Sequence, residues 1–360
     1  MEGNRAQAFN GVGPGSIIGF LQKPPQMRIG IVVNLSSPTT DYYRTVNPFI
    51  RLREVFPQFT IKMINPDTVK WYDFYDVDVV IFQRANGNDL LGMINEVKRM
   101  GKKIILDHDD LLHEVSAANP ASQHFNKPQV KESVEKAFKY ADWVMTSTPY
   151  LKEFYSQFYD KDKITIVPNA IDFTVTPMQP VKRDKLMDAK KRVIWRGSQT
   201  HLEDLATVKN FWIELQKNDK VELGMVGLAD WLGKTLYPKA IIVPWNNSLF
   251  QYFEMVKNSA PHYGVFPLTN DNFNQAKSNN FAMEMLVAGC ISYAPEEIKE
   301  FNIAGVRTYK NELDLIHKFT KALDKDDAYF VDLEAGRKWL QEERDLKKVN
   351  ILRLAIMESI

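Results

Sequence analysis

The chain has 360 residues, of which 44% are hydrophobic and 25% are charged, and its formal net charge is +1. This balance is typical of a soluble globular protein large enough for two cores, and it gives no global reason to expect a nucleic acid or an anionic membrane as partner. The single cysteine, Cys290, excludes a disulfide framework and a thiolate metal cluster. No apolar run reaches the roughly 18 residues that span a bilayer, and we find no signal peptide, so we expect a cytoplasmic protein.

After an N-terminal arm at 1–26, rich in Gly, Pro, Asn and Gln, the chain alternates apolar β-branched runs with amphipathic runs. Strands are predicted at 27–34, 59–64, 77–83, 102–106, 142–147 and from 163 onward. Helices are predicted at 49–55, 88–100, 130–141 and 148–158. Strands that alternate with helices predict a parallel sheet with right-handed crossovers. We therefore expect a first Rossmann-like domain at 27–173.

Polar residues follow the first predicted strand. Ser36 and Ser37 lie in the loop after it, and Tyr43 and Arg44 precede the next amphipathic run. Because ligands of open α/β sheets gather at the carboxyl ends of strands, these four residues are candidates for substrate contact. In the alternative interpretation, Tyr43 and Arg44 only cap and cover the helix.

The predicted strand at 102–106 runs directly into three carboxylates, Asp107, Asp109 and Asp110. Carboxylates this close repel one another unless a cation or a set of N–H donors lies beside them. Three interpretations remain open. They are a divalent metal site for a diphosphate, a carboxylate that binds or activates a substrate at a cleft, and a helix N-cap with solvated neighbours.

A Pro-rich and then Lys- and Asp-rich segment at 174–191 is the predicted interdomain linker. The α/β alternation then resumes and predicts a second Rossmann-like domain at 192–330. Its predicted strands cover 192–195, 221–226, 240–243, 263–268, a run after Cys290 and 304–309. Its predicted helices cover 202–216, 249–257, a run from Lys277 to Gly289 and 312–323. Residues 331–360 contain a long amphipathic run, predicted as one helix at 332–357.

Arg196, Gly197 and Ser198 form the turn between the first strand and the first helix of the second domain. The N–H groups of this turn could hold a diphosphate, and Arg196 could neutralise its charge. His201 and Asp204 lie three residues apart and share a helix face. Such a pair suggests acid–base chemistry, but we expect His201 rather to cap the loop or to contact phosphate.

A second cationic turn precedes the helix that Gly289 ends as a C′ glycine. Asn274, Lys277 and Ser278 lie in this turn, and Glu284 follows about two helical turns later. A lysine at a helix start suits a phosphate, and the carboxylate of Glu284 could accept hydrogen bonds from a ribose diol. In the alternative, this is a capped helix whose charged side chains are merely solvated. Trp245, after another predicted strand, could stack on a nucleobase, although such tryptophans often belong to the core.

Four stretches, 273–289, 107–112, 195–205 and 167–172, resemble the family-4-like glycosyltransferases with the GT-B fold. Residues 273–278 are similar to the F-N-x-x-K-S motif of one subgroup, and 284–289 match the second half of the family's two-glutamate pattern, whose first glutamate falls at Ala276. Residues 107–112 resemble that subgroup's D-x-D-D-L segment, and 195–205 resemble its phosphate loop. The run at 167–172 is similar to the family's V-P-N-G-I-D turn, with Ala170 in place of glycine.

The resemblance implies two Rossmann-like domains that face each other across a cleft, with a C-terminal helix that crosses back to the first domain. It implies transfer of a sugar from a nucleotide sugar to an acceptor hydroxyl, with retention and without a required metal or other cofactor. Arg196 and Lys277 would stabilise the departing diphosphate, and Asp109 or Asp110 would orient or deprotonate the acceptor. The implied donor contacts are Gly197, Ser198, His201, Trp245, Asn274, Ser278 and Glu284. The implied acceptor contacts are Ser36, Ser37, Tyr43, Arg44 and Asp107.

The acceptor itself stays open between a glycan, a small molecule and modified DNA. A hydroxymethylated pyrimidine in DNA would require a basic rim along the cleft, to which Arg44, Arg51, Arg53 and Arg84 could contribute. A non-catalytic binding protein with the same fold is the other alternative, because the family's first glutamate is missing at Ala276.

Overall fold

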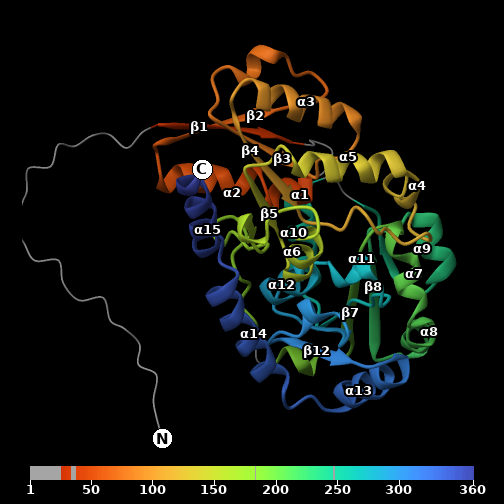
Figure 1. Ribbon diagram of the computed structural model, residues 1–360. Coiled ribbons are helices and arrows are strands. Elements are labelled where there is room, and N and C mark those ends of the chain that lie inside the picture. The colour runs from red at the N-terminus through yellow and green to blue at the C-terminus, as the bar shows by residue number, and fades with distance from the viewer. Residues whose placement is uncertain (1–25, 34–37, 183, 246–247) are drawn as a thin grey trace, which may run out of the picture.

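A computed structural model of the protein describes residues 26–33, 38–182, 184–245 and 248–360. Residues 1–25 of the predicted arm lie outside the described residues. The candidates Ser36 and Ser37 also lie outside them. The described chain forms two layered α/β units, each around its own sheet (Figure 1). Helices of the described part of the chain lack the combination of length and apolar character that a bilayer crossing requires.

The first sheet has six parallel strands in the order β2-β1-β3-β4-β5-β6. The strands are β1 (Met27–Val32), β2 (Phe59–Ile64), β3 (Val79–Gln83), β4 (Lys103–His108), β5 (Trp143–Thr146) and β6 (Ile164–Ile166). The helices around them are α1 (Pro38–Tyr43), α2 (Val46–Val55), α3 (Asn88–Arg99), α4 (Ser122–Phe125), α5 (Pro128–Phe138) and α6 (Pro149–Tyr155), with 3-10 turns η1 (Trp71–Phe74) and η2 (Lys161–Lys163).

Both faces of this sheet are covered, which explains why its strands are continuous apolar runs. Ile31 and Ile81 lie on one face with Phe49 of α2. Val80 and Leu106 lie on the other with helices α3 and α5. Neighbouring residues of a strand thus enter two different clusters, as the two-residue period of a strand requires.

The second sheet also has six parallel strands, in the order β12-β11-β10-β7-β8-β9. They are β7 (Lys191–Arg196), β8 (Val221–Val226), β9 (Ile241–Val243), β10 (Tyr263–Val265), β11 (Ile291–Pro295) and β12 (Val306–Tyr309). The helices are α7 (Leu202–Ala206), α8 (Lys209–Lys217), α9 (Asp230–Leu236), α10 (Leu249–Ser259), α11 (Asn272–Gln275), α12 (Asn280–Val287), α13 (Glu312–Asp324), α14 (Tyr329–Glu343) and α15 (Leu346–Ser359), with 3-10 turns η3 (Lys185–Met187), η4 (Gln199–His201) and η5 (Lys299–Phe301).

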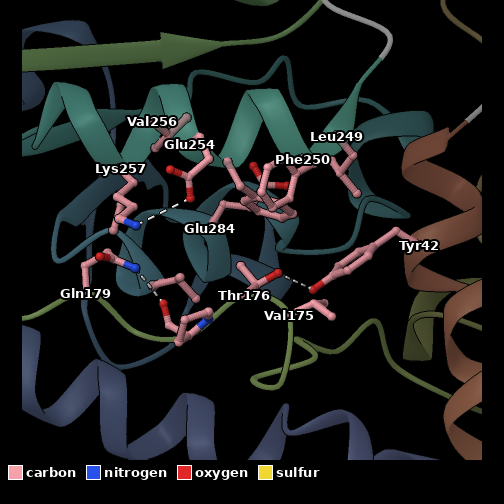
Figure 2. A pocket seen from close by; sticks show the side chains of 14 residues that line it. Tyr42, Val175, Thr176, Gln179, Leu249, Phe250, Glu254, Val256, Lys257 and Glu284 are labelled. Atoms are coloured by element: carbon pink, nitrogen blue, oxygen red, sulfur yellow. Dashed lines mark hydrogen bonds and ion pairs between the residues drawn. The ribbon is translucent and has the colours of Figure 1, made fainter.

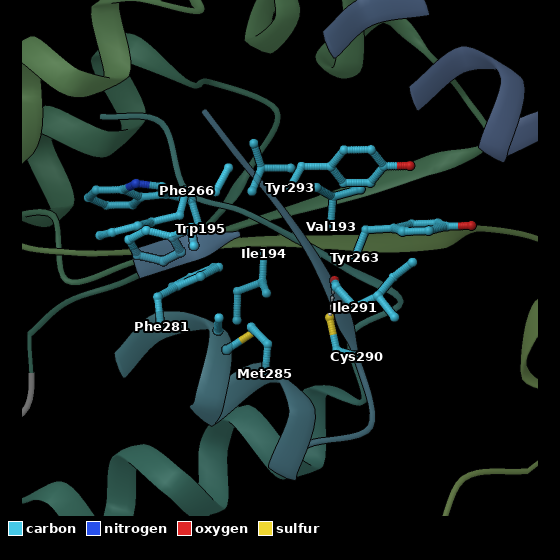
Figure 3. Close-up of a cluster of buried hydrophobic side chains, with 14 of the residues drawn as sticks. Val193, Ile194, Trp195, Tyr263, Phe266, Phe281, Met285, Cys290, Ile291 and Tyr293 are labelled. Carbon is cyan, nitrogen blue, oxygen red and sulfur yellow. Dashed lines mark hydrogen bonds between the residues drawn. The ribbon is translucent and has the colours of Figure 1, made fainter. Parts of the chain in front are cut away.

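The core under the second sheet is aromatic (Figure 3). The rings of Phe266 and Phe281 stack with their centroids 4.8 Å apart, and Trp195 is fully buried. Helix α12 can approach β10 this closely because Gly264 has no side chain: a Cβ there would lie 2.9 Å from atoms of Phe281 and Met285. This packing fixes α12, which carries Glu284, against the strands that carry the neighbouring turns.

Three predicted elements differ from the structure. Strand β4 continues to His108, so Asp107 belongs to the buried sheet and not to a polar loop. The predicted helix at 202–216 breaks after Ala206, where the Thr207 hydroxyl donates to the Asp204 carbonyl and competes with the helical hydrogen bonds. The predicted helix at 332–357 is two helices, because Asp345 accepts a hydrogen bond from Lys347 N and caps a new start.

Helix α15 returns to the first sheet (Figure 1). The Asn350 amide donates to the carbonyl of Pro48 at 2.9 Å, and Arg353, which is fully buried, donates to the carbonyl of Tyr43 at 3.4 Å. The C-terminal segment therefore lies against α1 and α2. The limits of the two domains and of the linker stay predictions.

Candidate functional site

A pocket of about 370 Å³ lies at the carboxyl ends of β7, β8 and β9. We call it the strand-end pocket. Its lining brings together three of the predicted donor residues, Arg196, Trp245 and Glu284. Trp245 is 53% exposed, so it belongs to the pocket wall and not to the core. The remaining lining residues are Thr39, Val226, Val243, Pro244, Leu249, Tyr252 and Met255.

Glu284 is the most heavily bonded group of the strand-end pocket. It accepts from Arg196 Nε at 2.8 Å and from Arg196 Nη2 at 2.7 Å. The hydroxyls of Tyr43 and Tyr252 donate to its two oxygens at 2.9 and 2.6 Å. A carboxylate has about four acceptor positions, so all of them are used. A ribose diol could reach Glu284 only in exchange for one of these donors.

The charges of this cluster are fixed by their mutual contacts. Burial alone would lower the pKa of the Arg196 guanidinium, but the Glu284 carboxylate outweighs burial and raises that pKa. Burial, reinforced by the same carboxylate, raises the pKa of the Tyr43 and Tyr252 hydroxyls well above the ordinary value. Both tyrosines are therefore protonated donors at neutral pH, and the Arg196 guanidinium is charged.

Sequence analysis does not single out Tyr252, although a signal for it exists. Leu249, Tyr252 and Met255 recur every three residues along α10, and all three line the strand-end pocket. Helical spacing therefore predicts that they share one face. Periodicity cannot tell that this face covers a pocket, because that depends on how α10 packs across β9 and α12.

The turn after β7 is built by two glycines that lie in contact. Gly227, with φ of +98°, follows β8, and a Cβ on it would lie 2.1 Å from the carbonyl oxygen of Gly197. The Gly197 N–H donates to Val226 O at 3.0 Å. Ser198 Oγ accepts from Thr200 N at 3.3 Å and so caps the following turn. Gly227 is a residue that this site needs and that sequence analysis sees only as the end of a strand.

His201 is held in one orientation by Asp204, with Nδ1 and Oδ2 2.7 Å apart. The other oxygen of Asp204 accepts from Thr269 N, Thr269 Oγ1 and Asn274 Nδ2. Asn274 is buried, and its amide nitrogen is used by Asp204 and Thr269. The structure therefore gives Asn274 a supporting position behind His201 in place of the predicted contact with a donor.

Lys277 reaches across to the first half of the chain. Its Nζ lies 2.9 Å from Asp110 Oδ1 and 4.0 Å from the ring centroid of Phe273. The neighbouring Ser278 Oγ accepts from Asn169 Nδ2 at 2.9 Å. Lys277 is absent from the described lining of the strand-end pocket, so its convergence with Arg196 on one diphosphate stays a prediction.

Cations accompany each carboxylate of the acidic cluster, as the repulsion argument requires. Asp107 pairs with Arg44, and both side chains are fully buried. Asp109 pairs with Arg84 at 2.5 Å. Asp110 lies between Arg84, at 2.9 Å, and Lys277. Within the described residues, no group of three or more His, Cys, Asp or Glu side chains could hold a metal ion.

These contacts correct three of the predicted acceptor residues. Arg44 also donates to Val167 O and Asn169 Oδ1, so Arg44 and Asp107 brace the end of β4 and expose no surface to a ligand. Tyr43 is 1% exposed and bonds Glu284. For Asp109, burial would raise the carboxyl pKa, but Arg84 and other cations outweigh burial and lower that pKa. Asp109 is therefore ionised at neutral pH.

A second, largely apolar pocket of about 200 Å³ lies beside the first (Figure 2). Glu284 and Leu249 line both pockets. Tyr42 closes this second pocket with a hydrogen bond to Thr176 Oγ1 at 2.9 Å. Phe250, 69% exposed, lines it from α10. Helix α10 thus contributes walls to two neighbouring cavities.

No family model and no curated protein matches the chain in sequence. Solved structures do match it in fold. HepE from Anabaena, in complex with UDP-glucose, has a TM-score of 0.68 at 10% identity over 93% of this chain and 100% of that chain. Sucrose-phosphate synthase from Thermosynechococcus elongatus has a TM-score of 0.67 at 10% identity, over 92% of this chain and 98% of that one.

An alpha-glucosyltransferase in complex with UDP and a 13-mer DNA containing an HMU base has a TM-score of 0.58 at 14% identity, over 93% of this chain and 100% of that chain. The chain has the GT-B fold. Two six-stranded parallel sheets with their helices account for the match over nearly the whole length of both chains. Identities this low establish the GT-B fold and leave the chemistry to the residues of the site.

Proposed function

We propose that the protein is a glycosyltransferase that moves a sugar from a nucleoside diphosphate sugar to an acceptor hydroxyl. The strand-end pocket supports the proposal, because Arg196, Trp245 and Glu284 of α12 line it together beside the carboxyl ends of three adjacent parallel strands. Nucleotides bind at this position in open α/β sheets. The fold neighbours that hold UDP-glucose or UDP support a uridine nucleotide as one candidate donor.

In this proposal, the indole of Trp245 stacks on the base and the guanidinium of Arg196 meets the diphosphate. Glu284 holds Arg196 through Nε and Nη2, which leaves Nη1 as the guanidinium nitrogen that Glu284 does not fix. The Ser198 N–H adds a donor on the same turn, whereas the Gly197 N–H is already bonded to Val226 O. A cation that is already oriented stabilises the charge that develops on the leaving group without reorganisation.

Lys277 links donor binding to the acceptor side. Its Nζ pairs with Asp110 Oδ1 at 2.9 Å. When the diphosphate attracts Lys277, the Asp110 oxygen that Lys277 occupied is released to accept a hydrogen bond from the attacking hydroxyl. We further propose that transfer proceeds with retention and without a metal ion. The pairing of Asp109 and Asp110 with Arg84 supports a role toward the substrate in place of metal binding.

A DNA acceptor has weaker support. Three arginines of the expected basic rim, Arg44, Arg51 and Arg84, are paired with Asp107, Asp172 and Asp109. Their charges are therefore matched within the chain, and the likeness to the DNA-bound alpha-glucosyltransferase is one of fold. DNA binding that weakens steeply with salt would restore this alternative.

The proposal is tested by a thermal-shift screen of UDP-, GDP- and ADP-sugars, followed by release of the nucleoside diphosphate from the best donor. Arg196→Ala and Lys277→Ala are expected to lower turnover at least a hundredfold, in line with the loss of one preorganised donor. Arg99→Ala and Lys217→Ala, at exposed positions with local ion pairs only, are the matched controls. Equal turnover in all five proteins would refute the assigned roles, and a lack of turnover with any donor would favour a non-catalytic binding protein.

A further inference from the structure

A third cavity, of about 800 Å³, lies at the carboxyl edge of the first sheet. We call it the first-sheet hollow. Val33 follows β1, Asn65 follows β2 and Gln83 ends β3, so three adjacent strands end at it. Its other polar lining residues include Asn86, Asp89 and His124. Of the residues that the sequence suggests for contact with a substrate, Arg84, a candidate for the basic rim, lies in its described lining.

The floor of the first-sheet hollow carries an unused hydrogen-bond donor. The side chain of Gln83 is more than nine-tenths buried, and its Nε2 has no hydrogen-bond partner. Buried polar groups are nearly always paired in folded proteins, and an unpaired one destabilises the fold. The unpaired amide of Gln83 is explained if a ligand that enters the hollow provides the hydrogen-bond acceptor for Nε2.

The next residue, Arg84, is strained in the same place. It has a φ of +46°, a conformation that side chains other than glycine rarely adopt and that clusters at functional sites. This conformation directs its guanidinium to Asp109 and Asp110. Arg84 therefore joins the hollow directly to the carboxylate that Lys277 contacts from the second half of the chain.

The first-sheet hollow also adjoins the strand-end pocket. Thr39 lines the strand-end pocket and Thr40 lines the hollow. Both residues belong to the first turn of α1, so the two cavities touch the same helical turn. A ligand in the hollow would lie beside a nucleotide sugar in the pocket.

The lining favours an uncharged ligand with many hydroxyl groups. Amides from Asn65, Gln83 and Asn86 offer both donors and acceptors. Asp67 and Asp89 add negative charge, whereas the charge of Arg84 is matched by Asp109 and Asp110. Such a lining repels a phosphate or a nucleic-acid backbone.

We propose that the first-sheet hollow binds a saccharide as the acceptor, and that the Gln83 amide donates a hydrogen bond to one of its oxygens. This rests on the proposed glycosyltransferase function and names the class of its second substrate. Gln83 is a specificity-determining residue in this arrangement, since it selects a ligand that brings an acceptor atom to the floor of the hollow.

The test measures saturation-transfer NMR on the full chain with UDP present. The probes are the methyl glycosides of glucose, galactose, mannose and N-acetylglucosamine, inorganic phosphate, and a short DNA duplex with a hydroxymethylated pyrimidine. At least one glycoside is expected to bind, and Gln83→Met is expected to weaken its binding at least fivefold. UDP affinity should stay unchanged, and the melting temperature should not fall, because the variant removes an unpaired polar group. Gln157→Leu, which changes an exposed glutamine outside the described lining of the hollow, is the control.

The outcomes separate this inference from the proposed function. If UDP fails to bind the wild type, the proposed function fails. If UDP binds but no glycoside does, or if Gln83→Met binds the glycoside as tightly as the wild type, the saccharide site is wrong. Binding of the DNA or phosphate alone would also overturn it. Asp89→Ala changes an exposed side chain at the rim, so it provides a second variant whose folding is not at risk, and weaker glycoside binding is expected there too.

Discussion

At the scale of single residues, the contacts of Glu284 show what a sequence can and cannot predict. The sequence predicts where Arg196 and Glu284 lie relative to their turns, because a glycine and a helix start mark each turn. The sequence does not predict that the two side chains pair directly, since this depends on how α12 packs against β7 across Phe281. The centroid of the Phe281 ring lies 5.8 Å from Arg196 Cζ. The sequence therefore predicts two groups around a ligand, whereas the structure pairs the two groups with each other.

Breaking this pair should destabilise the protein. In Glu284→Gln the partly buried guanidinium of Arg196 loses its counter-charge, and the free energy of unfolding is expected to fall by about 2 kcal/mol. Urea denaturation at pH 7 measures it. Tyr252→Phe, which removes a neutral donor to the same carboxylate, should cost about 1 kcal/mol. An unchanged denaturation midpoint in Glu284→Gln would contradict the pairing.

Two buried histidines should make the fold sensitive to acid. The ring of His108 stacks on Phe138 with the centroids 5.5 Å apart, and the ring of His113 stacks on Phe158 with the centroids 5.2 Å apart. None of the ring nitrogens of the two histidines has a hydrogen-bond partner. Burial lowers the pKa of His108 to about 3 and that of His113 to about 4. At a pH between these values and the ordinary histidine pKa of about 6.5, the two imidazoles therefore bind protons in the unfolded chain but not in the folded protein.

The sign of the effect follows from this difference. Above pH 6.5 both states are neutral and stability is complete, and it is lost as the pH falls from 6.5 toward the folded-state values. Between pH 6.5 and pH 5, each imidazole should remove about 2 kcal/mol from the free energy of unfolding. Denaturant titrations at both pH values test this. In His108→Phe the difference between them should shrink by about 2 kcal/mol, and an equal pH dependence in the variant would exclude His108 as its source.

At the scale of elements, the apolar runs of the sequence predict all twelve strands of the described chain, because buried parallel strands are continuous and rich in β-branched residues. The helix breaks after Ala206 and before Asp345 are not predicted. Both depend on side chains that cap or compete locally, and the second also on Ile171, whose backbone pairs with Arg344 and Leu346. Helical periodicity continues through such breaks and cannot reveal them.

Two glycine substitutions test whether the close contact between the turns after β7 and β8 matters for stability. Gly227→Ala places a methyl group 2.1 Å from a backbone oxygen at a positive φ, so it should cost roughly 3 kcal/mol of stability and weaken nucleotide binding. Gly92→Ala, inside α3 with no atom within 4 Å of the added carbon, should stabilise by about 0.5–1 kcal/mol. Thermal unfolding measures both. Equal effects of the two substitutions would show that the Gly197–Gly227 contact is unimportant.

At the scale of the whole molecule, the two halves share one core and several bonds. Tyr43 and Ile171, from the first half, belong to the hydrophobic cluster of the second sheet. Lys277–Asp110 and Asn169–Ser278 connect the halves as well. We therefore expect a single calorimetric transition, with calorimetric and van't Hoff enthalpies that agree. Two separate transitions would show that these contacts do not couple the halves.

The arrangement of the halves could not be predicted from local pattern. The pair Tyr43–Glu284 spans 241 residues and Lys277–Asp110 spans 167. Only the resemblance to a known fold anticipated that the carboxylates of the first half would face the cationic turns of the second. It did not anticipate that Lys277 would bond Asp110 directly, or that the unpaired amide of Gln83 would end β3.

A crystal structure of the protein with the nucleoside diphosphate sugar that raises its melting temperature most would test the central claim directly. The expected result is the base on Trp245, the diphosphate within hydrogen-bonding distance of Arg196 and of the Ser198 N–H, and Lys277 moved from Asp110 to the phosphate. Electron density for the nucleotide outside the strand-end pocket, or a diphosphate that contacts neither Arg196 nor Lys277, would contradict it.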